Sequence, residues 1–196
     1  MKYGEITFGQ MEAIINKLGG MEGVQRFLSG EIVVKAPEHT FKVWKTIKLG
    51  TLKNADEFRK ALKKADCKIG DWGNDILGKP AFMVASAEEE IQLVNLSVAE
   101  LGFKNGANYG DICAKAKELG LELCPNEVGP QLRLQYKDQP KGEYLRIAME
   151  PITGSDGHLD IFRVDRDGGD LWLSGSIGRS GDFWRANYRF VFRLRK

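Results

Sequence analysis

Beyond Pro130 the chain is a succession of short segments in which apolar and polar side chains alternate. Alternation with a period of two predicts strands, and the intervening stretches GSDG (154–157) and DGG (167–169) have the composition of tight turns. The segments expected to form strands are Gln131–Tyr136, Glu143–Met149, His158–Val164, Leu171–Leu173 and Tyr188–Arg195. We therefore expect an antiparallel sheet in the second half of the chain.

The alternation also predicts which side chains this sheet buries. Val191, Arg193 and Arg195 fall on the other parity of the last strand and are expected to face outward. The packed face is expected to carry Leu132, Leu134, Leu145, Ile147, Phe190 and Phe192.

The first half of the chain mixes helical and strand patterns. Thr7 and Gln10 form the signature of a capping box before a helix that ends at Gly19-Gly20, and Asn54 is expected to cap another. Further helices are expected at Met21–Leu28, with Val24, Phe27 and Leu28 inward, Asn54–Ala65 and Asp71–Leu77, and strands at Glu31–Lys35, Phe41–Leu49, Ala81–Ala85 and Ile91–Val98.

The loop Lys104–Asn108 is the best candidate for a domain boundary. A helix beginning at Asn108 or Asp111 and ending at Gly120 follows it. We expect an α+β fold in two units, a mixed helix and strand unit over 1–104 and a helix with a mostly antiparallel sheet over 105–196.

Bulk composition excludes several classes of protein. The net charge is +2, which predicts no strong general attraction to nucleic acid or anionic membrane. No apolar run approaches the roughly 20 residues that span a bilayer, and the first residues lack the apolar core of a signal peptide. We expect a cytoplasmic protein without a membrane partner.

The sequence offers little material for catalysis. Three cysteines without CxxC spacing and two histidines predict neither a disulfide framework nor a zinc site. Gly73–Lys79 has GxxxxGK spacing, but Pro80 stands where a phosphate-binding loop needs Ser or Thr, so a helix end is favoured. The aspartates near 156–170 lack the closing Glu of a calcium loop. We expect no catalytic residue, metal or cofactor.

Lysine gives way to arginine along the chain. Residues 1–141 hold 17 Lys and 3 Arg, whereas 142–196 hold 1 Lys and 8 Arg. Arg is the cation preferred at interfaces, and Ser174–Arg189 surrounds aromatic residues with Ser, Gly and Asn, the composition of a binding surface. Gly175, Gly178 and Gly181 predict a loop over 174–186, with Trp184 buried as an anchor. The expected ligand-binding residues are Arg179, Asp182, Phe183, Arg185, Tyr188 and Arg189.

Three functional classes remain open. The first is a non-enzymatic protein that presents 174–189 to a macromolecular ligand. The second is a nucleic-acid-associated protein that uses the Arg-rich C-terminus and the Lys-rich helix 53–68. The third is an enzyme with carboxylates in a cleft. Charge offers a simpler interpretation of the C-terminus, because 174–196 (+6 and −1, net +5) can neutralise 150–170 (+2 and −6, net −4) within one sheet.

Several stretches carry a resemblance across nearly the whole chain, namely NKLGGMEGVQRFLSGE, KIGDWGNDILGKPAF, ELGLELCPNEVGPQLRLQYKDQPKGE and FVFRLRK. They resemble a family of uncharacterised bacterial proteins, and the resemblance implies that 173–190 varies among relatives while FVFRLRK does not. That pattern is similar to the variable proteins of diversity-generating retroelements, whose mutagenesis acts at adenines. In Ser174–Arg189 only Trp184 lies outside the residue types that a mutated Asn codon can encode. This second resemblance implies a C-type-lectin-like fold.

Overall fold

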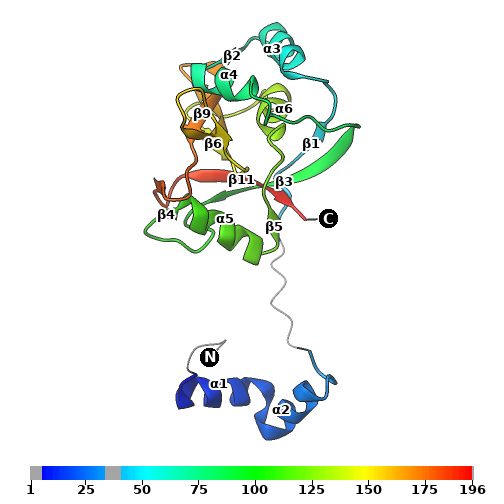
Figure 1. Ribbon diagram of the computed structural model, residues 1–196, viewed down its shortest axis with the longest axis vertical. Helices are drawn as coiled ribbons and strands as arrows, with labels where there is room; N and C mark the ends of the chain where they lie inside the picture. Colours follow the sequence, from blue (N-terminus) through cyan, green and yellow to red (C-terminus); the bar gives the residue numbers. More distant parts are fainter. Residues whose placement is uncertain (1–5, 34–40, 196) are drawn as a thin grey trace. The chain divides into compact units, whose positions relative to one another are not determined.

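The computed structural model describes residues 6–33 and 41–195. Contacts divide the chain into two compact units, Met1–Glu38 and His39–Lys196, and each is described by itself. The boundary expected at 104–105 lies inside the second unit, because strands from either side of it are hydrogen-bonded neighbours in one sheet. Helices and a large mixed sheet together make the α+β fold that the sequence predicts (Figure 1).

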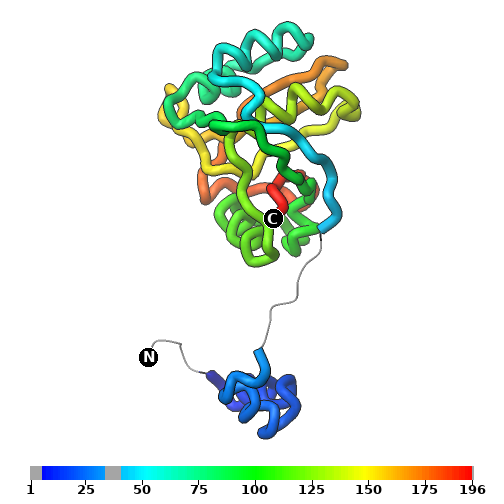
Figure 2. The backbone as a smooth tube through the Cα atoms, turned by 90° about the vertical axis from the view of Figure 1, so that its right-hand side faces the viewer, coloured from blue at the N-terminus to red at the C-terminus, as the bar shows by residue number. Residues whose placement is uncertain are grey.

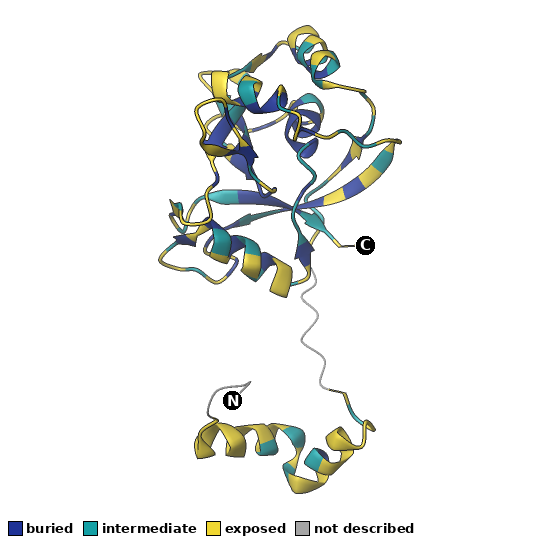
Figure 3. Cartoon of the chain, viewed as in Figure 1, coloured by how far each residue is buried: buried dark blue, intermediate teal, exposed yellow. Residues whose placement is uncertain are grey.

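The first unit is a pair of short helices, α1 (Phe8–Leu18) and α2 (Gly20–Leu28). The expected capping box is present, since Thr7 Oγ1 accepts from the Gln10 amide and the Gln10 side chain accepts from the Thr7 amide. Gly19 ends α1 at φ 90°, a conformation that glycine adopts without strain. The expectation that Phe27 and Leu28 turn inward is wrong, because both are exposed. Most of the described surface of α1 and α2 is exposed (Figure 3). The strand expected at 31–35 does not form over 31–33, and 34–35 lie outside the described residues.

The second unit is built on a curled sheet of nine strands within the described residues, in the order β1-β3-β11-β6-β8-β9-β2, with β5 beside β11 and β7 beside β8. Most pairs are antiparallel, and two are parallel, β11 with β6 and β2 with β9. The strands are β1 (Lys45–Leu49), β2 (Cys67–Ile69), β3 (Glu89–Ser97), β5 (Leu121–Glu122), β6 (Tyr144–Ile147), β7 (Ile152–Thr153), β8 (Leu159–Asp167), β9 (Asp170–Ile177) and β11 (Arg189–Leu194). A separate short pair joins β4 (Ala107–Asn108) to β10 (Phe183–Trp184).

Among the described residues, four helices complete the second unit: α3 (Ala55–Lys64), α4 (Asp71–Leu77), α5 (Tyr109–Glu118) and α6 (Val128–Gln135). Asn54 caps α3 as predicted, by accepting from the Glu57 amide. Helices α3, α4 and α6 gather at one end of the unit and α5 at the other (Figures 1 and 2). None of the helices in the described part of the chain is long and apolar enough to cross a membrane.

Strand β11 lies inside the sheet, between antiparallel β3 and parallel β6. Phe190 and Phe192 are fully buried, which confirms the expected core positions. Val191 is also fully buried, and here the expectation of an outward side chain is wrong. A central strand that is covered on both faces loses the polar alternation of a half-exposed one.

Helix α6 replaces the strand expected at Gln131–Tyr136. The helix contacts β1, β8 and β9, so the sheet curls around it. Residues 128–133 are all buried, and a helix buried on every side shows no amphipathic period by which to recognise it. Pro130 fits because it stands in the first turn, where its missing N–H has no helical acceptor. Gly129 is required, because a Cβ there would lie 2.5 Å from the Phe162 ring.

Buried polar groups fix α6 to the surrounding loops. The buried Glu127 carboxylate accepts from the amides of Gly50 and Ala85, each at 2.8 Å, and from Gln131 Nε2. These bonds explain why Ala81–Ala85 is not the expected strand: the amide of Ala85 is used by a side chain, as is that of Met83, which donates to Asn126 Oδ1.

Helix α4 is tied to the turn between β7 and β8 through Asp75. Its carboxylate accepts from the Ser155 amide at 2.7 Å and the Ser155 hydroxyl at 2.6 Å, and Lys79 Nζ lies 3.1 Å away. The Ser155 bonds, followed by Lys79, lower the pKa of Asp75 from 3.8 to about 2. The GxxxxGK stretch is therefore the end of a helix, with its lysine in an ion pair.

We predict that Asp75→Asn makes the melting temperature less dependent on pH at acid pH. A carboxyl with a depressed folded-state pKa stabilises the fold above its unfolded pKa, and this contribution is lost as the pH falls from about 4 to about 2. Thermal melts across pH 2–7 should show a lower midpoint for Asp75→Asn at pH 7 and a smaller loss in that window. Ser155→Ala should show part of the same reduction in pH dependence, and a variant curve parallel to that of the wild type would contradict the assignment.

Candidate functional site: an arginine-lined hollow

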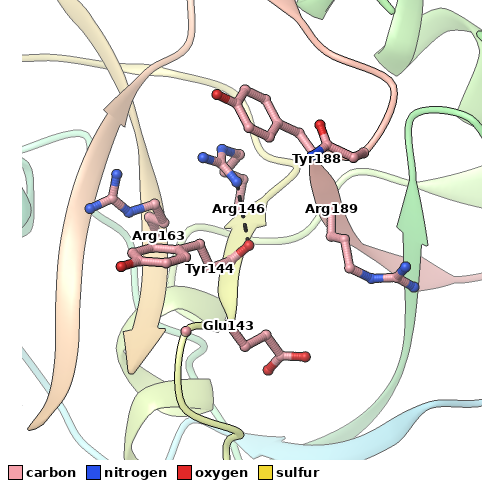
Figure 4. Close-up of a pocket in the computed structure, with 8 residues that line it drawn as sticks. Glu143, Tyr144, Arg146, Arg163, Tyr188 and Arg189 are labelled. Carbon is pink, nitrogen blue, oxygen red and sulfur yellow. Dashed lines mark hydrogen bonds between the residues drawn. The ribbon is translucent and has the colours of Figure 1, made fainter. Parts of the chain in front are cut away.

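Arg146 and Arg163 lie opposite each other on adjacent strands, β6 and β8. Side chains alternate along a strand, and their neighbours Leu145 and Val164 belong to the buried core. The two arginines therefore project from the other face of the sheet. A hollow of about 510 Å³ opens there (Figure 4). Its labelled lining residues are Glu143, Tyr144, Arg146, Arg163, Tyr188 and Arg189.

Arg146 stands at the centre of this hollow and is nearly buried, with 8% of its surface exposed. Its guanidinium lies 4.3 Å from the centre of the Tyr188 ring and 4.9 Å from that of Trp184. Its Nη1 donates a hydrogen bond to the Tyr144 carbonyl at 3.3 Å, drawn as a dashed line in Figure 4. Burial, followed by the charge of Arg163, lowers the pKa of Arg146 to about 10, so it stays charged at neutral pH.

The two flanking arginines are compensated. Arg163 Nε donates to both oxygens of the buried Asp165, at 2.8 and 2.9 Å, and the guanidinium lies 5.5 Å from the Tyr144 ring centre. Arg189 binds Asn95 through its side-chain and backbone oxygens, and its Nη1 lies 3.3 Å from Glu100. Arg146 differs, because no carboxylate of the described residues lies within ion-pair distance of it.

Two further hollows adjoin the first through shared residues. One of about 300 Å³ is also lined by Arg146, Arg163 and Tyr188, together with Asp182 and Phe183. Another of about 290 Å³ includes Arg163 and Trp72. We call these three adjoining hollows the trough; arginines and aromatic side chains line it.

The structure distributes the predicted site residues over this trough and its rim. Tyr188 and Arg189 line the first hollow, and Asp182 and Phe183 line the second. Arg179 lies on the rim, paired with Asp182 at 2.9 Å. Arg185 is exposed and lines neither hollow.

Segment 174–186 is less of a loop than expected. Residues 174–177 continue β9 in register with β8, and Phe183–Trp184 pair with β4. The glycines are tolerated in the strand because neighbours approach closely: a Cβ on Gly175 would lie 2.7 Å from the Trp72 Cβ. Trp184 is 6% exposed and packs on Phe190 at 5.4 Å, so it is the buried anchor that the sequence predicts.

Arg146, Arg163 and Tyr144 were not among the predicted site residues. The alternation of Glu143–Met149 assigns Arg146 to the outer face, and that parity is correct. The missing information is that Tyr188 and Trp184, some forty residues later, fold over it. Each of the expected strands Glu143–Met149 and His158–Val164 carries an arginine, Arg146 and Arg163. Two arginines in strands that pair are the signal in the sequence that points to the hollow.

The three cysteines and His158 line none of these three hollows. Burial raises the pKa of Cys113 to about 11 and raises that of Cys124 well above its usual range, so both thiols stay protonated at neutral pH. His158 is exposed beside Asp156. No group of three His, Cys, Asp or Glu in the described ranges is arranged to hold a metal ion.

Comparison with known proteins adds nothing to this geometry: no protein-family model, no curated protein and no solved structure matches the chain.

We predict an order of stability effects along the segment. Trp184→Ala should lower the free energy of unfolding by about 3 kcal/mol, as for a core truncation. Arg185→Ala should change it by no more than about 0.5 kcal/mol, as at an ordinary surface site. Tyr188 packs on Trp184 and Arg146 and is half-buried, so Tyr188→Ala should fall between them rather than match Arg185. Urea unfolding measures all three, and a larger effect for Arg185→Ala than for Trp184→Ala would refute the anchor.

Proposed function

We propose that this is a non-enzymatic binding protein, that its contact surface comprises residues 178–189 with the trough behind them, and that its ligand is a protein. The observation that carries the proposal is that exposed and buried side chains follow one another along this segment. Phe183 is 62% exposed and Arg185 is exposed, while Trp184 between them is buried. A large apolar ring and a free arginine held in solvent by a buried anchor are typical of interface hot spots.

The backbone of this segment is held independently of its outward side chains. Tyr109 and Gly110 donate to the carbonyls of Asp182 and Ser180, each at 2.9 Å. Ala99 donates to Ala186, also at 2.9 Å. Main-chain bonds of this kind do not depend on which side chains project outward. This supports a surface whose side chains change among relatives while its frame stays fixed, as the resemblance to variable proteins implies.

The nucleic-acid alternative is weakened by the pairing of the C-terminal arginines. Arg193 lies 3.7 Å from Glu89 and from Glu122, and Arg195 lies 3.6 Å from Glu122. Acidic groups also enter the trough, through Glu143 and Asp182. A polyanion would meet these carboxylates as well as the arginines.

A cytoplasmic location belongs to the same proposal. Cys67, Cys113 and Cys124 are all free thiols, and free cysteines are usual where the surroundings are reducing.

Panning a library of random peptides against the purified protein tests the proposed surface. We expect the enriched peptides to lose at least tenfold in affinity, about 1.4 kcal/mol, towards the double variant Phe183→Ser/Arg185→Ser. The matched control is Lys63→Ser/Lys64→Ser, two exposed residues of α3, which should bind as the wild type does. Peptides whose affinity is unchanged by Phe183→Ser/Arg185→Ser but reduced by Lys63→Ser/Lys64→Ser would place the binding surface elsewhere.

Salt dependence separates protein from nucleic acid as the partner. Each phosphate that a protein neutralises releases counterions, so such binding weakens steeply with salt. We expect only weak binding to DNA or RNA, lost at physiological salt, when fluorescence anisotropy is measured from 20 to 200 mM. Submicromolar binding at physiological salt would instead support the nucleic-acid alternative.

A further inference from the structure

Arg146 is buried without the partners that a buried cation needs. Its Nε has no hydrogen-bond partner, and Trp184 Nε1, whose ring lies against it, has none either. Both side chains line the hollow of about 300 Å³ beside Phe183. An unpaired buried charge is costly. Arg133 and Arg166 also have an unpartnered Nε, so what sets Arg146 apart is that its guanidinium end faces a hollow, where an acceptor from a ligand can reach it.

Arg133 is a buried arginine whose terminal nitrogens are both paired, although its Nε, like that of Arg146, has no hydrogen-bond partner. It is fully buried, and both terminal nitrogens donate to fixed acceptors: Nη1 to Gln139 Oε1 and to the Asp165 carbonyl, and Nη2 to the Tyr136 carbonyl. At Arg146 the terminal nitrogens make the one 3.3 Å bond to Tyr144 and face the hollow. The rings of Trp184 and Tyr188 pack against the guanidinium of Arg146. They leave its terminal nitrogens open to the hollow.

We propose that Arg146 is a recognition site for a carboxylate group of the ligand. A guanidinium fork matches a carboxylate in two parallel hydrogen bonds, and the aromatic walls exclude the water that would weaken them. The charge of the lining selects a single negative charge. Arg163 is paired with Asp165 and Arg189 with Glu100, which leaves Arg146 without an ion pair. Glu143, which also lines the hollow, would repel a doubly charged phosphoryl group more than a carboxylate.

This inference rests on the proposed function, since it specifies the ligand of the same surface. The carboxylate site can nevertheless be refuted while the binding surface is confirmed. If library-selected peptides depend on Phe183 and Arg185 yet are indifferent to Arg146, the binding surface stands and the carboxylate site does not.

The first test compares stability in two variants. Arg146→Met keeps an unbranched chain between the two rings and removes the charge, so its melting temperature should equal or exceed that of the wild type. Arg133→Met, the matched control, strips fixed acceptors of their donor and should lower the melting temperature by more than ~5 °C. If Arg146→Met falls as far as Arg133→Met, the arginine is part of the structure and the proposal is overturned.

The second test uses small probes of defined chemistry on the wild-type protein, at constant ionic strength. N-acetyl-aspartate amide offers a side-chain carboxylate and N-acetyl-glycine a terminal one. Titration followed by nuclear magnetic resonance should give a dissociation constant of roughly millimolar for at least one of them, as for a single small contact. The preferred probe identifies the source of the carboxylate.

Variants and a competing anion decide the outcome. Arg146→Met should weaken the preferred probe at least tenfold, and Arg146→Lys should recover part of the binding because it keeps the charge without the fork. Inorganic phosphate should bind more weakly than the carboxylate. Tighter binding of phosphate, no binding of either carboxylate, or binding that survives Arg146→Met would each overturn the assignment.

Discussion

The second unit depends on one packing constraint, the enclosure of α6 by the curled sheet. Residues 128–133 are buried on every side, and Gly129 lies so close to Phe162 that no larger side chain fits without a shift. The buried Glu127 carboxylate accepts from the amides of Gly50 and Ala85, and Arg133 Nη1 donates to the Asp165 carbonyl of β8. Apolar packing and buried hydrogen bonds thus fix the same helix, and the sheet curls around it.

This enclosure decides what the other face of the sheet can do. Because Leu145, Ile147 and Phe162 serve the core, the alternate residues Arg146 and Arg163 stand on the opposite face, where Trp72 of α4 lines a hollow beside Arg163. The chain covers that face with Trp184 and Tyr188. The C-terminal segment therefore buries Trp184 against the core and leaves Phe183 and Arg185 exposed; in the proposed function these exposed residues and the trough contact the ligand.

The predictable part of this structure is the part governed by local rules. Caps and periodicity act over a few residues, so the sequence alone predicts the features that depend on them. These are the capping residues Thr7 and Asn54, the helix Asp71–Leu77 and most of the alternating strands of the second half. Helix α6 is not among them, since burial on every side erases its pattern. Of the residues expected in the site, Asp182, Phe183, Tyr188 and Arg189 line the trough, and Trp184 is buried as expected. Arg146 was missed, because an ordinary outward strand position becomes a buried cation only when a distant segment folds over it. The likeness to C-type-lectin-like variable proteins stays a prediction.

The central claim is that the exposed side of 178–189 and the Arg146 hollow form one binding surface. A crystal structure of the protein with a peptide selected against it tests this most directly. The account predicts that the peptide contacts Phe183 and Arg185 and places a carboxylate oxygen against the guanidinium of Arg146. A peptide seated on α3 or elsewhere, with the trough left untouched, would contradict it.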